Sequence, residues 1–437
     1  MTQRESDVTP HTSRLERDFA PLLLHPAVLL AAEAAGADAC HLVGGALRDA
    51  RLGLEFRDLD LVIERHGRPF AHRVAATMPA RLVELGGDRF AAFRLVADDL
   101  TLDIWDRQGA PIEADLARRD LTIHSFAVEI SSGAIVDPFG GLVDLDDKVL
   151  RATSETSFSS DPLRVVRLAR FAAQLPGFTT SDPTLILAAE SAAALDRVAS
   201  ERIRVEVEHL LALPGFLSAA ELLVRLKLYP GLWLPLASHG SISYGSEELA
   251  TRLRRLELLA DHTEERVEMA LARQAVLIAG LPLKTEQTAA DTVDHCHQEG
   301  LLTRATAKQL MRLLAWDDLP RDTASRRWFL HRNGSLWPTV ACFLAATSQR
   351  PCTVASYQEN LARFEALCRT SGKEIFEPEP LLSGTDLVSE LGLQEGRELG
   401  RILSTIQRRQ VEGRLTTRDE ALSLARLLAL QGSDNTG

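Results

Sequence analysis

The sequence predicts an α+β fold class: an amino-terminal α+β domain followed by all-α segments. Between about residues 40 and 139, short β-like runs alternate with short helical stretches, which is typical of an α+β domain. The β-like runs are CHLV, DLDLVI, RLVEL, LTLDIW and AIVDPF. From about residue 160 onward, long segments rich in alanine, leucine and arginine have helical spacing, and β-like alternation nearly disappears. We therefore expect the remainder of the chain to be helical.

The composition is that of an ordinary folded, water-soluble protein. Of the 437 residues, 45% are hydrophobic and 25% are charged, which excludes a largely disordered or fibrous chain. The net charge of −12 excludes nucleic-acid binding through a uniformly basic surface, so any RNA partner must bind local basic patches. Only five of the 49 basic residues are lysines, and arginine is the residue suited to bidentate recognition of phosphates and bases. A genome rich in G and C is the alternative explanation of this bias.

Cysteine usage and hydropathy indicate a cytoplasmic protein. The five cysteines include no CxxC pair, and an odd number of scattered cysteines favours a reducing compartment over a disulfide scaffold. The amino-terminal stretch is too polar for a secretory signal. The longest uncharged run, residues 333–349, contains Pro338 and several polar residues, so it predicts a buried helix rather than a membrane span. We expect no membrane association.

The densest group of glycines and carboxylates lies in residues 41–64, HLVGGALRDARLGLEFRDLDLVIE. Gly44 and Gly45 stand between a β-like run and a short helix, where glycine lets the backbone approach a phosphate and the helix offers its free amides. An ordinary tight turn is the alternative. Asp58 and Asp60 follow on a strand-like run, so their carboxylates project from the same face and favour a Mg²⁺ site. A solvated acidic strand end is the alternative for an isolated pair of this kind.

Two further segments strengthen the metal and phosphate hypotheses. Asp103 lies on LTLDIW, a second strand-like run that can lie beside the first. DLARRDLTIH then places Arg118 and Arg119 beside Asp120, which supplies planar cations for a triphosphate or a ribose. A surface ion pair is the alternative interpretation of these arginines.

SSDPLRVVRLARFAAQL predicts a helix with an arginine-rich face. Asp161 is the expected N-cap and Pro162 the first helical residue. Arg164, Arg167 and Arg170 follow at intervals of three, so they share one broad face, because successive positions drift by about 60°. An amphipathic helix with a solvated arginine face is the alternative.

Taken together and in order, these segments resemble the class II tRNA nucleotidyltransferase and bacterial poly(A) polymerase family. The resemblance is carried by GGALRD, RDLDLVIE, ARRDLTIHSFAVEI, GAIVDPFGGLVDLDDKVLRAT and SSDPLRVVRLARF. ERIRVEVEHLL at residues 201–211 belongs to it, and residues 381–422 are similar to the carboxyl-terminal segment of the bacterial tRNA enzymes. The resemblance is strong over residues 38–215 and 381–425 and weak between them. An ordered series of this kind is far more specific than any one of its members.

The resemblance implies a nucleotidyltransferase head, with a mixed sheet and flanking helices, followed by an all-α neck, body and tail. The domains that it implies are an amino-terminal extension (1–26), the catalytic head (27–152), a neck with a base-reading helix (153–236), a body (247–370) and a tail that is a candidate for tRNA binding (381–431). Residues 237–246 and 371–380, which are polar or contain proline, are the linker candidates.

The resemblance also implies roles for individual residues. Asp58 and Asp60 would hold Mg²⁺, and Asp103 is the expected assisting acid. The nucleotide-binding set that the resemblance implies is Gly45, Arg48, Arg119, Asp161, Arg164, Arg167 and Arg170. Within this set, Asp161 and Arg164 would read the base, and the others would lie on the phosphate and sugar side.

Four departures from the family pattern affect the expected activity. Ser160 stands where the family usually has a glutamate, which removes one base-orienting carboxylate, and His124 stands where an asparagine usually lies. Arg118 follows Asp103 by only 15 residues, which is markedly shorter than the flexible loop of full CCA-adding members and is associated with members that stop after CC. Residues 272–284 lack the histidine-aspartate pair that some relatives carry there, so we expect no phosphohydrolase activity.

The sequence therefore predicts an Mg²⁺-dependent enzyme that transfers CMP from CTP to the 3′ end of tRNA without a template and releases pyrophosphate, with CC addition favoured. The alternatives within the class also use ATP: full CCA addition, A addition or poly(A) synthesis. From another class, Ser160 and His124 make a catalytically silent RNA-binding protein on the same scaffold conceivable. Against that alternative stand the intact site residues Asp58, Asp60, Arg119, Asp161 and Arg164.

Overall fold

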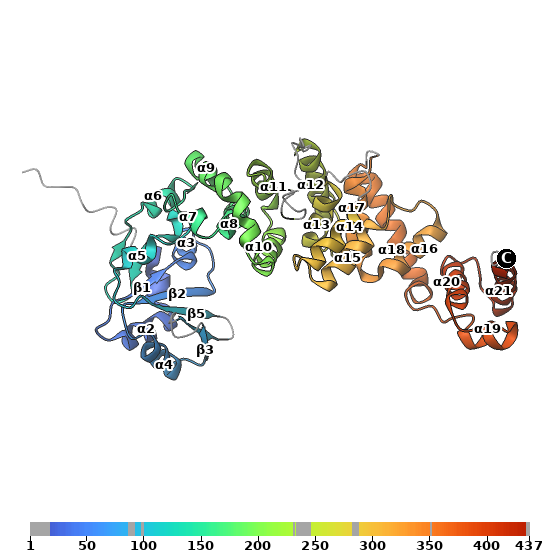
Figure 1. Ribbon diagram of the computed structural model, residues 1–437, viewed down its shortest axis with the longest axis horizontal. Helices are drawn as coiled ribbons and strands as arrows, with labels where there is room; N and C mark the ends of the chain where they lie inside the picture. Colours follow the sequence, from blue (N-terminus) through green and yellow to red (C-terminus); the bar gives the residue numbers. More distant parts are fainter. Residues whose placement is uncertain are drawn as a thin grey trace, which may run out of the picture. The chain divides into compact units, whose positions relative to one another are not determined.

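The computed structural model describes residues 18–85, 92–97, 100–229, 232, 246–281, 288–349 and 352–433. Internal contacts divide the chain into two compact units, Met1–Ala199 and Ser200–Gly437, which Figure 1 colours along the sequence. This boundary falls inside the stretch 153–236 that is expected to form the neck. Most of the expected amino-terminal extension and nearly all of the first linker candidate, residues 237–246, lie outside the described residues.

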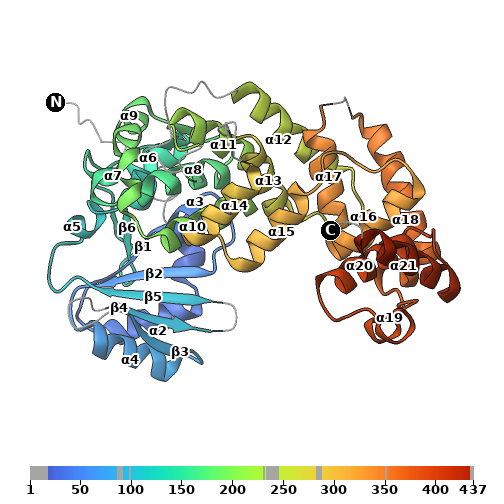
Figure 2. The ribbon, with the colours of Figure 1, turned by 45° about the vertical axis from the view of Figure 1, so that its right-hand side comes forward.

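A mixed sheet forms the centre of the first unit. Within the described part of the chain it has seven strands in the order β3-β4-β5-β2-β1-β6-β7. Strands β2 and β5 pair in parallel, and the other neighbours pair antiparallel. The strands are β1 (Cys40–Val43), β2 (Asp58–Ile63), β3 (Arg81–Leu85), β4 (Ala92–Val96), β5 (Thr101–Asp106), β6 (Ala127–Glu129) and β7 (Ile135–Val136). Figure 2 shows β2 and β5 running side by side, and the predicted α+β class is confirmed.

Helices surround this sheet and continue the first unit beyond it. Helices α2 and α4 pack together, and α4 also lies against β3, β4 and β5 (Figure 1). A second, two-stranded sheet pairs β8 (Val149–Leu150) with β9 (Thr179–Thr180). The helices are α2 (Pro26–Ala35), α3 (Gly45–Arg51), α4 (Gly67–Thr77), α5 (Ile112–Leu116), α6 (Gly141–Asp146), α7 (Ser157–Ser160), α8 (Leu163–Gln174) and α9 (Asp182–Ser191), with 3-10 turns η1 (Thr122–His124) and η2 (Ala192–Arg197).

The second unit is helical throughout its described residues, as predicted. Its helices are α10 (Ser200–Ala212), α11 (Phe216–Arg225), α12 (Ser246–Asp261), α13 (Met269–Ala279), α14 (Ala289–Gln298), α15 (Arg304–Leu314), α16 (Thr323–Asn333), α17 (Trp337–Thr347), α18 (Val354–Phe376), α19 (Gly384–Leu391), α20 (Arg397–Val411) and α21 (Arg418–Ser433), with a 3-10 turn η4 (Gly334–Leu336). Helix α18 runs into the second linker candidate, residues 371–380, and is kinked at Ser371. No helix among the described residues is both long and apolar enough to cross a membrane.

Two strands of the sheet were not predicted from the sequence. Strand β4, AFRLV, was missed although its residues alternate between buried and exposed from Phe93 onward. Strand β6, AVE, has only three residues, which is too short for a period of two to be recognised. The five predicted β-like runs all contain a strand, and the two missed strands lie outside those runs.

The turn before α6 depends on a glycine for steric reasons. A Cβ atom on Gly141 would lie 2.2 Å from the backbone oxygen of Thr122, which is far inside contact distance. Because both groups belong to the main chain, neither can move aside without displacing α6 or η1.

We therefore expect Gly141→Ala to destabilise the first unit by about 3 kcal/mol, the upper range for overpacking. Hydrogen exchange of the β1 and β2 amides measures this loss. Gly400→Ala in α20 is the control, because a Cβ atom there meets nothing within 4 Å and alanine favours the helix. Full β1 and β2 protection in Gly141→Ala would contradict the steric argument.

Candidate active site

Three carboxylates lie together on two neighbouring strands. Asp58 and Asp60 are two residues apart on β2, so their side chains leave the same face of the sheet. In the parallel register of β2 with β5, Asp60 pairs with Asp103. Paired residues on adjacent strands project to the same face, about 5 Å apart at their backbones. The structure thus brings together the three acids that the sequence singled out.

The electrostatic environment of Asp60 indicates a shortage of positive charge. Burial raises the pKa of Asp60 to about 6, and the negative charges of Asp103 and Asp58 act in the same direction. The guanidinium groups of Arg119 and Arg94 oppose this shift without cancelling it. A bound cation would favour the ionised carboxylate, so the site fits a hard metal ion bound by oxygen.

Arg94 on β4 forms hydrogen bonds with the third carboxylate of the cluster, that of Asp103. It stands opposite Asp103 in the antiparallel register of β4 with β5. Its Nε and Nη2 atoms donate to the two oxygens of Asp103, both at 2.7 Å. Among the residues that the structure describes, no group of three or more histidine, cysteine or acidic side chains is arranged to hold a metal ion. Asp58 and Asp60 are therefore the oxygen donors available here, and Mg²⁺ commonly binds one or two carboxylates together with substrate phosphates.

The glycine pair fits closely against this acid cluster. Gly44 has φ of 80° and ψ of −147°, a conformation that residues other than glycine rarely adopt. A Cβ atom at Gly44 would lie 2.7 Å from Oδ2 of Asp60 and 3.2 Å from Nη1 of Arg119. The absence of a side chain therefore lets the Asp60 carboxylate and the Arg119 guanidinium approach the turn. Gly45 is the first residue of α3.

Arg48 is buried beneath the glycine turn. It is 3% exposed, and its Nε and Nη2 atoms donate to the two carboxylate oxygens of Asp49 at 2.8 and 2.9 Å. Its Nη1 atom lies 2.8 Å from Nε2 of His124. A Cβ atom on Gly45 would lie 3.6 Å from Nη2 of Arg48. Arg48 is thus held inside the protein close to Gly45, and its expected contact with the nucleotide stays a prediction.

Arg118 and Arg119 differ in how they are held. Arg119 has a side chain that is 20% exposed and donates through Nη2 to Asp115 at 2.9 Å. The side chain of Arg118 is 74% exposed, and its backbone oxygen accepts from Nη2 of Arg164 at 2.6 Å. Nη1 of Arg164 donates to the backbone oxygen of Ser157 at 3.0 Å. Arg164 therefore ties the start of α8 to the Arg-Arg-Asp segment.

Helix α8 begins one residue later than expected, at Leu163. Pro162 already has helical dihedral angles, and Oδ1 of Asp161 accepts from the backbone amide of Leu163 at 3.3 Å. A short unpredicted helix, α7, precedes it. Arg167 donates through Nε to Oδ2 of Asp120 at 2.9 Å, and the Arg170 guanidinium lies over the ring of Phe171, 4.4 Å from its centroid.

His124 connects several of these groups. It is 5% exposed, and its Nδ1 atom lies 2.9 Å from Oδ1 of Asp120. Burial lowers the pKa of His124 to about 4; the charge of Asp120 opposes this shift, and those of Arg48 and Arg167 add to it. Burial acts to raise the pKa of Asp120, but His124 and Arg167 hold it well below its usual value. Imidazole is therefore neutral and aspartate ionised at neutral pH.

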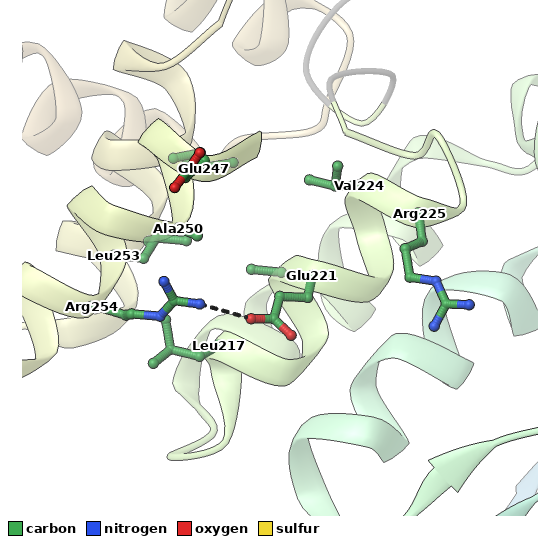
Figure 3. Close-up of a pocket in the computed structure, with 10 residues that line it drawn as sticks. Leu217, Glu221, Val224, Arg225, Glu247, Ala250, Leu253 and Arg254 are labelled. Atoms are coloured by element: carbon green, nitrogen blue, oxygen red, sulfur yellow. Dashed lines mark hydrogen bonds and ion pairs between the residues drawn. The ribbon is translucent and has the colours of Figure 1, made fainter. Parts of the chain in front are cut away.

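The second unit has a cavity of its own. It has a volume of about 440 Å³ and is lined by α11 and α12, as Figure 3 shows. Leu217, Val224 and Leu253 contribute to its apolar lining, and Glu221 pairs with Arg254 at 3.2 Å. None of the expected catalytic or nucleotide-binding residues lines this cavity.

The sequence did not identify Arg94 as a residue of the candidate site and did not give Gly44 a role separate from that of Gly45. Arg94 lies on a strand that was not predicted, although its alternation with Phe93 and Leu95 carried the signal. Gly44 was noted only as one of a pair, and the close approach of Asp60 that requires it depends on the pairing of β1 with β2.

The low pKa of His124 predicts a pH dependence of stability. Its pKa is about 4 in the folded protein and 6.5 ordinarily, so below pH 6.5 the unfolded chain binds a proton that the folded chain does not. The free energy of unfolding therefore decreases as the pH falls from 6.5 towards 4. Between pH 6.5 and 5, wild type should lose about 2 kcal/mol more than His124→Asn. Hydrogen exchange of the β1 amides at both pH values measures the difference, and equal losses would contradict it.

Comparisons with known proteins agree with this arrangement. Residues 40–151 match the family described as the poly(A) polymerase head domain. The chain is 30% identical over 413 residues to a CC-adding tRNA nucleotidyltransferase of Geobacter sulfurreducens, covering 87% of this chain and 89% of the relative. It is 28% identical to a CCA-adding enzyme of Streptococcus mutans, covering 90% of this chain and 94% of the relative.

The fold is also similar to solved structures. The Thermotoga maritima CCA-adding enzyme complexed with tRNA has a TM-score of 0.63 and 20% sequence identity, with 96% of this chain and 98% of that chain covered. From the relative that is 30% identical over nearly its whole length, the chain belongs to the class II tRNA nucleotidyltransferase family, a family of metal-dependent nucleotidyltransferases.

Proposed function

We propose that this enzyme transfers CMP from CTP to the 3′ end of tRNA, without a nucleic-acid template, and stops after two cytidines. Family membership supports the reaction class, and the cluster of Asp58, Asp60 and Asp103 supports metal-assisted transfer. Such a substrate, together with the scattered cysteines, favours a cytoplasmic location.

Asp58 and Asp60 are the residues that would hold the metal ion, and we propose Mg²⁺. When bound, the ion would supply charge stabilisation at the α-phosphate and at the leaving pyrophosphate. Asp103 would assist once it is released from Arg94, which now occupies both of its oxygens. The attacking group is the 3′-hydroxyl of the tRNA.

The remaining site residues are proposed to bind and orient the nucleotide. The backbone at Gly45 and the partly exposed guanidinium of Arg119 would lie against the phosphates and sugar. Asp161 and Arg164, at the start of α8, would read the hydrogen-bonding edge of the base. Arg167 and Arg170 would lie on the phosphate side. Because Arg48 is buried, it would act through the glycine turn that it supports.

The observation that carries the choice of CC addition is the fold of residues 107–117. The backbone amides of Arg107 and Gly109 donate to the oxygens of Ile63 and Glu64 at the end of β2, at 3.0 and 2.8 Å. The helix α5 that follows has only five residues. Its Ile112 and Leu116 are buried in a core cluster with residues of β1, β2 and β6. A segment anchored in this way has no length left to reach over a nucleotide.

Full CCA addition, A addition and poly(A) synthesis are the alternatives within the class, and the relatives named above include both CC-adding and CCA-adding enzymes. The silent RNA-binding protein is disfavoured because all three acids are present and adjacent. The hydroxyl of Ser160 donates to the backbone oxygen of Ser157 at 3.2 Å, which is a hydrogen bond within the short helix α7. The choice among the polymerising activities therefore depends on residues 107–117.

The metal assignment predicts that Asp58→Ala and Asp60→Ala lose incorporation of labelled CMP into tRNA by a factor of about 10² or more, with the fold retained. Glu84→Gln is the matched control, because Glu84 is an acid of the same sheet, pairs with Arg68 and lies on β3 outside the cluster. Incorporation and far-ultraviolet circular dichroism are measured for all three variants. Near-normal turnover in either aspartate variant would refute the assignment.

The proposed stopping point is tested with a tRNA that lacks its CCA end. The purified protein is incubated with CTP alone, ATP alone or both, and the tRNA is analysed by mass spectrometry. We expect two added cytidines with CTP, the same product with both nucleotides, and no product with ATP alone. A terminal adenosine or an oligo(A) tail would sink the CC-adding proposal, and no extension at all would sink the tRNA-extending activity.

A further inference from the structure

His124 has one possible arrangement of its ring proton. Its Nε2 atom lies 2.8 Å from Nη1 of Arg48, and a guanidinium group can only donate hydrogen bonds. Nε2 must therefore accept, so the proton of the neutral ring is on Nδ1. Nδ1 then donates to Oδ1 of Asp120 at 2.9 Å. Both contacts require the same tautomer, in which His124 accepts a hydrogen bond at Nε2 and donates one at Nδ1.

The hydrogen-bonded chain continues from Asp120 to helix α8. Oδ1 of Asp120 receives His124, and Oδ2 receives Nε of Arg167 at 2.9 Å. Nη2 of Arg167 also lies 2.9 Å from the same oxygen. Arg48 belongs to α3 and Arg167 to α8. Four side chains thus form a continuous link, Arg48–His124–Asp120–Arg167, between two helices of the first unit.

The aromatic ring of Phe171 packs against three of the four side chains of this link. It lies 4.5 Å from the His124 ring, and the guanidinium carbons of Arg48 and Arg167 lie 5.7 and 5.5 Å from its centroid. Phe171 is 4% exposed, so these contacts are shielded from water. Hydrogen bonds in such surroundings are stronger than in water, and an unpaired member would be costly.

The two ends of the link lie next to proposed nucleotide contacts. Nη2 of Arg48 is beneath Gly45, at 3.6 Å from the position of a Cβ atom there. The side chain of Arg167 is 35% exposed, and the proposed function assigns it to the phosphate side of the nucleotide. A displacement of Arg48 would therefore be transmitted through His124 and Asp120 to Arg167, and the reverse.

We propose that His124 is a positioning residue: a neutral hydrogen-bond link that holds Arg48 and Arg167 at one fixed spacing, so that the glycine turn and helix α8 bind the nucleotide as one unit. This rests on the proposed function, because it takes the nucleotide to lie between that turn and α8. His124 itself is buried and is not proposed to touch the nucleotide.

Two conservative variants each break one end of the link. The amide of asparagine can take the place of Nδ1 but does not reach that of Nε2, so His124→Asn keeps the bond to Asp120 and loses Arg48. Glutamine reaches the place of Nε2, so His124→Gln keeps Arg48 and loses Asp120. Ser125→Ala is the matched control: Ser125 is the next residue and fully buried, and the hydrogen bonds of its hydroxyl in the described structure are to the backbone of Leu121 and to the hydroxyl of Thr153.

The test is a double-mutant cycle on the dissociation constant of a non-cleavable CTP analogue with Mg²⁺, measured by calorimetry. We expect Arg167→Ala to weaken binding about tenfold in the wild-type background and about twofold or less with His124→Asn or His124→Gln. With Ser125→Ala, the effect of Arg167→Ala should remain about tenfold. Hydrogen exchange of the β1 amides verifies that each variant is folded.

The outcomes separate this inference from the proposed function. Additive effects of Arg167→Ala and both His124 variants would overturn the link, even where the wild type extends tRNA normally. Non-additive effects would support the link, even where the wild type fails to extend tRNA and the tRNA-extending function is lost. A wild type that does not bind the analogue would overturn both.

Discussion

The parallel pairing of β2 with β5 is the constraint on which the rest of the first unit depends. It places the carboxylates of Asp60 and Asp103 on adjacent strands and the same face, with Asp58 close by. Like charges at this spacing repel each other unless cations lie among them. Arg94 and Arg119 supply positive charge in the structure, and the pKa of Asp60 is still raised to about 6. A site with this residual imbalance is suited to bind a metal ion.

The arginines that neutralise these acids also connect the neighbouring helices and turns. Arg119 approaches Asp60 beside the glycine turn, and the missing side chain of Gly44 provides the space for it. Asp115 on α5 holds Arg119 from the other side. The backbone of Arg118 in turn accepts the guanidinium of Arg164 at the start of α8. Short-range contacts therefore extend from the acid cluster to the helix proposed to read the base, in a chain whose overall charge is −12.

The sequence predicted those features that depend on spacing along the chain. The alternation of DLDLVI predicted that Asp58 and Asp60 share a face, and the three-residue spacing of the arginines predicted the α8 helix. Contacts that depend on strand register could not be predicted, and the bidentate pair of Arg94 with Asp103 is of this kind.

The sequence also did not predict which charged side chains are buried. Arg48 forms hydrogen bonds with Asp49 and His124 inside the protein, and its expected place on the nucleotide stays a prediction. A sequence does not reveal which charged residue finds buried partners. His124 was noticed only as a departure from the family motif, and its two partners become visible only in three dimensions.

The packing of residues 107–117 links the acid cluster to the proposed stopping point. Moving this segment would expose Ile112 and Leu116, and burial of each such side chain is worth about 1.5–3 kcal/mol. It would also pull Asp115 away from Arg119, which adjoins Asp60. A pocket that must change shape to accept a second base would have to overcome both costs within one binding step. A pocket that accepts only CTP keeps the segment in place. Under the proposed function, the limit on synthesis would arise from how firmly the segment is packed, since the contacts that hold Arg119, which is proposed to bind the phosphates, would also oppose a change in the shape of the pocket.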